Sequence, residues 1–271
     1  MRIARFVHND TIAYGTVELD EDHGEHPGTI QVLNGDPLVA PVQYTGERLL
    51  LDDVRLVAPV IPRSKVAAIG RNYAAHAAEM DSDVPAEPMV FLKPNTAVIG
   101  SGEPIIYPTQ TSAVDHEGEL AVVIGRICKD VPVERVPEVV FGYTCGNDVS
   151  ARDLQKSDGQ WGRAKGFDTF CPLGPWVVTH LSIAEASDLQ IRATVTRDGR
   201  TIERQSSTTA HMVHGIAELV SFVSSFTTLL PGDVILTGTP EGVGRIEPGD
   251  TVHVEIEGIG TLSNPVVATD G

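Results

Sequence analysis

Short apolar segments separated by glycine and proline are the feature that most limits how this 271-residue chain can fold. The segment at 251–256 alternates cleanly, with Val252, Val254 and Ile256 on one face and polar residues on the other. Other segments have the length and composition of buried strands. The expected strands lie near residues 65–69, 89–92, 119–124, 139–144, 176–179, 190–197, 233–237 and 251–256.

Two segments have helical patterning instead. Residues 212–227 place apolar side chains such as Ile216, Leu219 and Val223 at helical spacing, and the turn sequence PGD follows at 231–233. Residues 73–80 (YAAHAAEM) are rich in alanine, the strongest helix former. Because the strands outnumber the helices and do not alternate with them, the pattern predicts a β-dominated α+β fold rather than a regular βαβ array.

Composition excludes several classes of protein. A hydrophobic content of 41% and a charged content of 21% are those of an ordinary globular protein. The net charge of −17 argues against a nucleic-acid partner, since phosphate binding needs a basic surface. No apolar leader or membrane-length segment is present, and Cys128, Cys145 and Cys171 have no zinc-site spacing. We therefore expect a cytoplasmic protein with reduced thiols and no membrane partner.

The chain divides near residue 60. Residues 1–60 contain short β-type pieces separated by turns, which predicts a small N-terminal β-rich domain. The sequence VAPVIPRS, with Pro59 and Pro62, has the composition of a connector. Residues 61–271 then form the larger domain.

Two glutamates precede the most apolar strand. Glu117 and Glu119 stand two residues apart in DHEGELAVVIG, so on a strand both carboxylates project from one face. Two adjacent buried carboxylates raise each other's pKa. A divalent cation would offset both the free-energy cost of burying their charges and the repulsion between them. A solvated strand end is the alternative, and these two residues alone do not decide between them.

A third carboxylate follows another strand. In FGYTCGNDVSARDLQ, Asp148 comes directly after an apolar segment. An Asp at such a junction is usually a cap or turn residue, but with the glutamates it completes a set of three hard oxygen donors. Such a set suits Mg²⁺ or Mn²⁺, with Ca²⁺ as a possible substitute, and leaves coordination positions open for a chelating substrate.

Three further motifs offer candidate site residues. His76 and Glu79, three apart on the expected helix, share a face, so they are either a surface ion pair, as most such pairs are, or a dyad in which the glutamate orients the imidazole for general-base work. Lys165, among glycines and aromatics in QWGRAKGFDTF, is either a surface residue or a cation that stabilises a developing oxyanion. The glycine-rich LTGTPEGVG contains Thr239 and lacks a nucleotide-binding pattern, so it is a tight turn or a carboxylate-binding loop.

Six motifs in order carry a resemblance to a known family: AIGRNYAAHAAE, FLKPNTAVIG, DHEGELAVVIG, GNDVSARDLQ, WGRAKGFDTFCPLGPW and LLPGDVILTGTPEGVG. Together, over about residues 64–268, they resemble the fumarylacetoacetate hydrolase family. They are most similar to its smaller bacterial and mitochondrial branch of acylpyruvases, oxaloacetate decarboxylases and 2-hydroxyhepta-2,4-diene-1,7-dioate isomerases. The resemblance implies a mixed β-sandwich roll, a homodimer and a Mg²⁺ or Mn²⁺ site.

The resemblance also implies roles for particular residues. Glu117, Glu119 and Asp148 would be the metal ligands, and His76 and Glu79 a base dyad on a mobile lid helix. Lys165 and Gln155 would line the pocket, and Thr239 would contact the substrate carboxylate. Arg71, Lys93 and Arg152 match family positions near the site, and the resemblance leaves their roles open.

Together these features imply a metal-dependent enzyme that acts on small 2-oxo dicarboxylates or diketo acids through a metal-chelated enolate. The sequence leaves the reaction open among C–C bond hydrolysis, decarboxylation and tautomerisation or isomerisation. The alternative functions are the isomerisation of 2-hydroxyhepta-2,4-diene-1,7-dioate specifically, and metal or ligand binding without turnover. Two departures from the family pattern stand out. His116 replaces an aromatic residue, and Arg71-Asn72 stands where the larger fumarylacetoacetases carry another metal-binding aspartate, so hydrolysis of fumarylacetoacetate itself is not expected.

Overall fold

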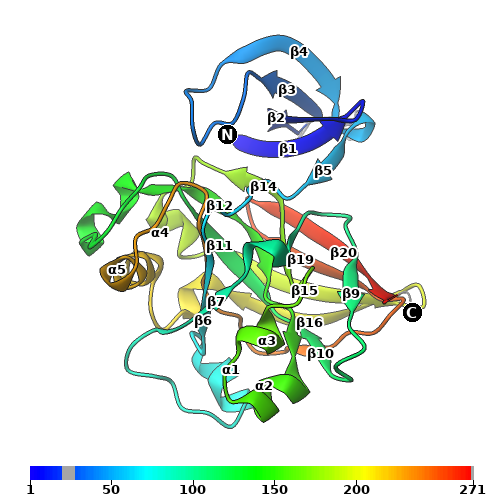
Figure 1. The fold of residues 1–271 in the computed structure, drawn as a ribbon, viewed down its shortest axis with the longest axis vertical. Helices are drawn as coiled ribbons and strands as arrows, with labels where there is room; N and C mark the ends of the chain where they lie inside the picture. Colours follow the sequence, from blue (N-terminus) through cyan, green and yellow to red (C-terminus); the bar gives the residue numbers. More distant parts are fainter. Residues whose placement is uncertain (20–27, 270–271) are drawn as a thin grey trace.

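The computed structural model describes residues 1–19 and 28–269, and strands dominate it (Figure 1). The largest sheet has the strand order β4-β3-β2-β1-β14-β12-β11-β17-β6-β7, with β5 paired to β1 and β8 to β14. Its strands are β1 (Arg2–His8), β2 (Thr11–Glu18), β3 (Thr29–Leu33), β4 (Tyr44–Leu50), β5 (Arg55–Val57), β6 (Val66–Gly70), β7 (Met89–Lys93), β8 (Val98–Ile99), β11 (Gly118–Ile124), β12 (Val140–Asn147), β14 (Cys171–Val178) and β17 (Val234–Leu236).

Two smaller sheets complete the larger domain. A five-stranded sheet has the order β16-β15-β19-β20-β9, and a three-stranded sheet has the order β13-β10-β18. Their strands are β9 (Ile105–Tyr107), β10 (Val114–His116), β13 (Ser150–Ala151), β15 (Gln190–Arg197), β16 (Arg200–Thr208), β18 (Gly244–Arg245), β19 (Thr251–Ile256) and β20 (Gly260–Ala268).

Helices are short and lie outside the sheets. In Figure 1, α1, α2 and α3 gather at the end of the molecule opposite β1–β4. The α-helices are α1 (Ala74–Glu79), α2 (Arg152–Asp158), α3 (Gly162–Lys165), α4 (Ile183–Ala186) and α5 (Ile216–Phe226). The 3₁₀ helices are η1 (Leu51–Asp53), η2 (Asn95–Ala97), η3 (Val133–Glu138) and η4 (Thr209–His211).

Strand β11 is buried on both faces, as its apolar composition predicts. Leu120, Val122 and Ile124 point into a core cluster that includes side chains of α5 and of the five-stranded sheet. Ala121 and Val123 point the other way, into a cluster with side chains of β6, β14 and β17. Because neighbours hold the strand on both sides, its leading end is fixed in position.

The β-dominated fold predicted from the sequence is confirmed, and each of the eight predicted strands has a counterpart. Both predicted helices are shorter than expected. α1 spans Ala74–Glu79 within the predicted 73–80, and α5 begins at Ile216, not at 212, because residues 209–211 form a 3₁₀ turn and Gly215 is extended. The strand predicted at 176–179 begins earlier, at Cys171, because that segment also pairs with β8 and β12. The boundary near residue 60 stays a prediction, since β1 continues the main sheet by pairing with β14 at Arg2 and Ile3.

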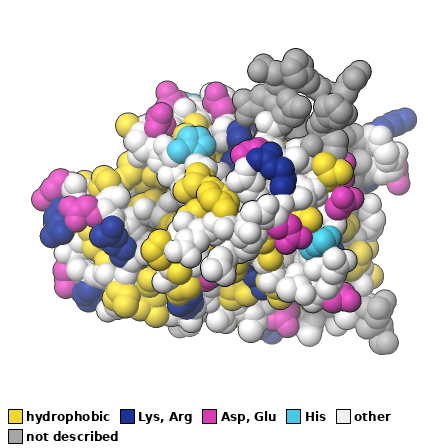
Figure 2. Space-filling view, turned by 90° about the horizontal axis from the view of Figure 1, so that it is seen from above, with side chains coloured by type: hydrophobic (Ala, Val, Ile, Leu, Met, Phe, Trp, Pro, Cys, Tyr) yellow, Lys and Arg dark blue, Asp and Glu magenta, His cyan; other side chains and the backbone are white. Residues whose placement is uncertain are grey.

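No helix in the described part of the chain is long and apolar enough to span a membrane. On the face drawn in Figure 2, basic side chains are scattered among acidic and hydrophobic ones instead of forming one basic patch.

Candidate metal centre

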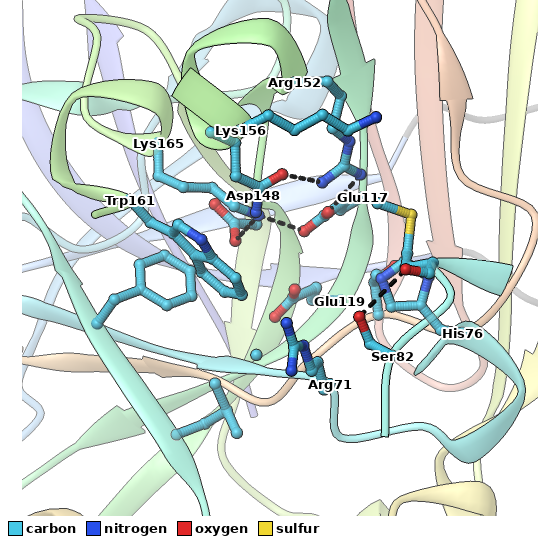
Figure 3. A pocket seen from close by; sticks show the side chains of 16 residues that line it. Arg71, His76, Ser82, Glu117, Glu119, Asp148, Arg152, Lys156, Trp161 and Lys165 are labelled. Carbon is cyan, nitrogen blue, oxygen red and sulfur yellow. Dashed lines mark hydrogen bonds and ion pairs between the residues drawn. The ribbon is translucent and has the colours of Figure 1, made fainter. Parts of the chain in front are cut away.

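A pocket of about 210 Å³ opens where α1, α2 and α3 meet the end of β11. Of the eleven residues predicted for the site, nine line this pocket (Figure 3). Glu79 is hydrogen-bonded to one of them, His76, and Lys93 to another, Asp148. The nine lining residues are Arg71, His76, Glu117, Glu119, Asp148, Arg152, Gln155, Lys165 and Thr239. Fold geometry therefore brings together residues that are up to 168 positions apart in the chain.

Backbone pairing places the three carboxylates. Glu117 stands at the break between β10 and β11, and its carbonyl oxygen accepts a hydrogen bond from the Asp148 backbone N–H at 2.9 Å. Its own N–H donates to Oδ1 of Asn147 at 2.9 Å. Oxygen atoms of Glu117, Glu119 and Asp148 lie within 4.8 Å of one another, and all three residues are buried. The sequence predicted both glutamates on one strand; the structure places only Glu119 within β11 and still brings the carboxylates together.

Buried cations neutralise two of the carboxylates. Nζ of Lys165 lies 2.6 Å from Oε2 of Glu117 and 2.7 Å from Oδ2 of Asp148 (Figure 3). Lys93 donates to the other oxygen of Asp148, and Nη2 of Arg152 lies 2.5 Å from Oε1 of Glu117. Burial would raise the pKa of Glu117, but Lys165 and Arg152 outweigh it and hold that pKa well below its ordinary value. Burial likewise opposes the charge of Lys165, yet Asp148 and Glu117 raise its pKa.

Among the residues that the structure describes, Glu119 makes no ion pair with a lysine or arginine. Its carboxylate accepts a hydrogen bond from the Gly238 backbone N–H at 2.7 Å, and in Figure 3 no dashed line joins it to another drawn side chain. Burial, together with the like charges of Asp148 and Glu117, raises the pKa of Glu119 well above its ordinary value. The pocket thus contains one buried carboxylate that pairs with no described cation and whose charge Lys165 offsets only in part.

This imbalance is what a divalent cation would correct. Three carboxylate oxygens that converge within 4.8 Å are hard donors of the kind Mg²⁺ and Mn²⁺ prefer. A cation beside Glu119 would supply the positive charge that its surroundings lack. The residues present therefore fit a divalent metal ion held by Glu117, Glu119 and Asp148.

The predicted dyad has the geometry expected of a proton-transfer pair. Nδ1 of His76 lies 3.2 Å from Oε2 of Glu79, one turn further along α1. The same carboxylate accepts the Gly242 backbone N–H at 3.1 and 3.2 Å. His76 is buried and lines the pocket, and among the described residues its Nε2 makes no hydrogen bond. Nε2 is therefore available to a ligand.

The predicted substrate-binding residues differ in whether their polar atoms already have hydrogen-bond partners in the protein. Arg71 lines the pocket from a left-handed backbone conformation (φ 58°) and makes no hydrogen bond or ion pair to any described residue. Oε1 of Gln155 accepts a hydrogen bond from Arg152 at 3.0 Å. The Thr239 hydroxyl donates to Gly118 O at 2.8 Å, so its hydrogen is already used within the protein.

Sequence reasoning missed the apolar wall of the pocket. Phe91 and Trp161 meet edge to face with ring centroids 5.2 Å apart, and Nζ of Lys165 lies 5.3 Å from the Phe91 centroid. Met80, at the end of α1, also lines the pocket. The aromatic residues flanking Lys165 in the sequence were a signal for such a wall, but their packing partner on β7 is 70 residues away from Trp161.

His116, the unusual residue of the glutamate motif, does not line the pocket. It is fully buried in β10, where its backbone pairs with Gly244 of β18. Burial, against the raising effect of Asp115 and with the help of Arg204, lowers its pKa to about 4. His116 is therefore a neutral side chain at neutral pH.

The fold and the site together define a class: β-sandwich proteins with a buried three-carboxylate centre under a histidine-bearing helix. Comparison with known families agrees. Residues 65–267 match the model described as fumarylacetoacetate (FAA) hydrolase C-terminal, and residues 1–59 match Rv2993c-like, N-terminal. The chain belongs to the fumarylacetoacetate hydrolase family, as the six sequence motifs predicted.

Similar proteins include curated relatives and solved structures. Protein Rv2993c of Mycobacterium tuberculosis is 52% identical over 98% of this chain and 98% of its own length. A mitochondrial oxaloacetate tautomerase of Bos taurus is 44% identical over 79% of this chain and 70% of its own.

Two solved structures share the fold. A 5-carboxymethyl-2-hydroxymuconate delta-isomerase from Mycobacterium smegmatis has a TM-score of 0.88 at 52% identity, covering 99% of this chain and 100% of that one. A maleylpyruvate hydrolase from Sphingobium sp. SYK-6, in complex with manganese(II) ion and pyruvate, has a TM-score of 0.78 at 30% identity and covers both chains fully, at 100% each.

Proposed function

We propose that this chain is a Mg²⁺- or Mn²⁺-dependent enzyme that tautomerises or isomerises a small 2-oxo dicarboxylate. The observation that carries the proposal is the buried carboxylate triad beside Lys165, with the imidazole of His76 in the same pocket. Glu117, Glu119 and Asp148 would hold the cation, which when bound would supply Lewis-acid chemistry to a chelating 2-oxo acid. The isomerase and tautomerase relatives, at 44–52% identity, favour proton transfer over hydrolysis as the outcome.

His76 would move the proton. Its Nδ1 is held by Glu79, so Nε2 can take a proton from the substrate carbon next to the keto group and return it elsewhere on the conjugated system. The Glu79 carboxylate would stabilise the imidazolium that forms meanwhile. Because Glu79 is itself held by the Gly242 N–H, the ring orientation is fixed.

Lys165 and Arg71 would bind the negatively charged groups of the substrate. Lys165, anchored by Glu117 and Asp148, would stabilise the negative charge that develops on the substrate oxygen during proton removal. Arg71, which has no partner among the described residues, would bind the second carboxylate of the substrate. The pocket's three lining cations besides Lys165, namely Arg71, Arg152 and Lys156, favour a dianionic substrate in an otherwise acidic protein.

C–C hydrolysis is the second candidate function, favoured by the likeness to a maleylpyruvate hydrolase. The same His76–Glu79 dyad would then activate water. Binding without turnover is a weaker candidate, because a binding protein does not require the dyad. The homodimer and the cytoplasmic location remain predictions.

A substrate panel with Mg²⁺ or Mn²⁺ tests the proposal. Oxaloacetate, 2-hydroxyhepta-2,4-diene-1,7-dioate, an acylpyruvate and fumarylacetoacetate are each followed by NMR, which separates tautomers from cleavage products. We expect proton exchange or isomerisation of the dicarboxylates, abolished by chelator and restored by Mn²⁺. A Glu119→Ala protein with full Mg²⁺-dependent turnover would overturn the metal assignment, and cleavage of acylpyruvate as the fastest reaction would favour hydrolysis.

A further inference from the structure

Gln205 is a buried residue that no site motif contains. It lies in β16 and is 1% exposed, and it does not line the pocket. Its side-chain amide makes three hydrogen bonds. Oε1 accepts from the Gly118 N–H at 2.9 Å, and Nε2 donates to Thr239 Oγ1 and to Pro240 O, both at 2.7 Å. These three partners belong to the two segments that build the carboxylate centre.

The first segment is the backbone between two of the carboxylates. Gly118 separates Glu117 from Glu119, so the orientation of its peptide groups sets the direction of both side chains. Gln205 holds its N–H, and the Thr239 hydroxyl holds its carbonyl oxygen at 2.8 Å. A Cβ at position 118 would lie 3.2 Å from Oε1 of Gln205, closer than an ordinary contact, so a side chain at this position would press on the amide.

The second segment is the loop of residues 238–242. Its first residue, Gly238, donates its N–H to Glu119 at 2.7 Å, and its last, Gly242, donates to the Glu79 carboxylate. Between them, Gln205 holds Pro240. The loop therefore connects a carboxylate of the triad with the acidic member of the dyad, and Gln205 fixes its middle to β11.

A buried and fully bonded glutamine is also what a purely structural bridge between two sheets would look like. Two details distinguish this one. Its bonds fall on Gly118, which lies between two of the carboxylates, and on the loop that contacts Glu119 and Glu79, and the ring Gly118–Gln205–Thr239 is closed by the Thr239 hydroxyl. Loss of the amide would leave the Gly118 N–H and the Pro240 carbonyl without these partners. Rotation of the corresponding peptide groups toward other partners would then reorient the carboxylate side chains.

We propose that Gln205 is a positioning residue that sets the geometry of the metal centre from outside the pocket. The proposal rests on the proposed function, since it assigns Gln205 a part in holding Glu117 and Glu119 for a divalent cation. Residues that orient metal ligands typically contribute about 10–100-fold to metal affinity or activity. Gln205 would also hold the loop that orients Glu79 behind His76.

The test compares Mn²⁺ affinity with thermal stability. Mn²⁺ binding is measured by EPR and calorimetry on the wild type, Gln205→Leu and Gln205→Glu, with Thr237→Val as matched control. Thr237 is also buried and bonds its hydroxyl to Leu120 O at 2.9 Å, on the same strand but away from Gly118. Its variant reports the cost of a lost hydrogen bond to β11 alone.

We expect Gln205→Leu to weaken Mn²⁺ binding by about 10-fold or more and to alter the EPR line shape. Thr237→Val should lower Tm and keep the affinity within about twofold. Gln205→Glu keeps the shape and replaces a donor with an acceptor facing Thr239 and Pro240, so it should also weaken binding, and it supplies the measurement if the leucine variant does not fold.

The outcomes separate the two proposals. Gln205 variants with lowered Tm but wild-type Mn²⁺ affinity and spectrum would show a structural role only and overturn this inference. A wild-type protein that binds no Mn²⁺ would overturn the proposed function itself.

Discussion

The ammonium group of Lys165 lies 2.6 Å from Oε2 of Glu117, and both side chains are almost fully buried. A buried ion pair is stabilising only when further partners satisfy the remaining charges. Here Asp148 takes a second bond from Lys165, while Arg152 takes the other oxygen of Glu117. The pair is thus one part of a charge network that can tolerate loss of the lysine.

Replacing Lys165 by methionine should reduce turnover and leave metal binding intact. Arg152 still neutralises Glu117 and Lys93 still neutralises Asp148, so the chain should fold. Loss of one donor to a developing oxyanion costs about 10²–10³-fold in kcat. The greater negative charge at the centre should keep Mn²⁺ affinity at least as high as in the wild type, as measured by calorimetry.

The control for this variant is Lys129→Met, which removes an exposed lysine paired with Asp130 in another part of the molecule. Its kcat and Mn²⁺ affinity should both match the wild type. Undiminished turnover in Lys165→Met would contradict the assigned role of the lysine, and a large loss of Mn²⁺ affinity would contradict the charge argument.

Replacing Glu119 by glutamine should stabilise the metal-free protein while weakening metal binding. Glu119 is a buried carboxylate that faces two others and accepts one backbone hydrogen bond, so a neutral amide of the same shape removes repulsion. A gain of about 1 kcal/mol corresponds to roughly 2–4 °C in Tm. Calorimetry with and without Mn²⁺ would measure both effects.

In that experiment the wild type should gain Tm on addition of Mn²⁺ by mass action, and Glu119→Gln should gain much less. Asp53→Asn, a neutralisation of an exposed carboxylate, serves as the control for charge alone. A metal-free Glu119→Gln protein less stable than the wild type would show that the repulsion is already relieved in some other way.

Replacing Asp233 by alanine should destabilise the fold equally in the presence and absence of a divalent metal. Its buried carboxylate accepts hydrogen bonds from the backbone N–H groups of Ser64, Lys65 and Leu230, and from the Ser64 hydroxyl. These bonds join the segment before β6 to the turn before β17. Loss of a buried, charge-assisted network costs about 3 kcal/mol, which urea unfolding at pH 7 would measure.

The same network makes a prediction for pH. Burial opposes the charge of Asp233, but the hydrogen bonds, led by Ser64, lower its pKa below the ordinary value of 3.8. A carboxyl with a lower pKa in the folded state contributes stability that is present above 3.8 and is lost as the pH falls through the folded value. The stability difference between wild type and Asp233→Ala should therefore shrink in acid, and a difference unchanged between pH 7 and pH 3 would contradict this.

Much of the secondary structure could be predicted from the local pattern of residues in the sequence. Strands such as 251–256 and 119–124 carry their periodicity in the sequence, and the helix at 73–80 needs only its alanines to be recognised. The start of α5 could not be placed, because the segment before Ile216 is held by tertiary bonds: the backbone N–H of His214 donates to Asn72 at 2.8 Å. No local pattern reports a partner 142 residues away.

The site divides in the same way. The sequence by itself determined the chemical types present: three carboxylates, a His–Glu pair at helical spacing and a lysine among aromatics, in an order shared with a family. Only the tertiary structure decided that Glu117 and Asp148 pair with buried cations while Glu119 pairs with none in the described ranges 1–19 and 28–269, and that Gln205 reaches Gly118. Charge balance and hydrogen bonding depend on distances between segments, and those distances are set by sheet packing rather than by spacing along the chain.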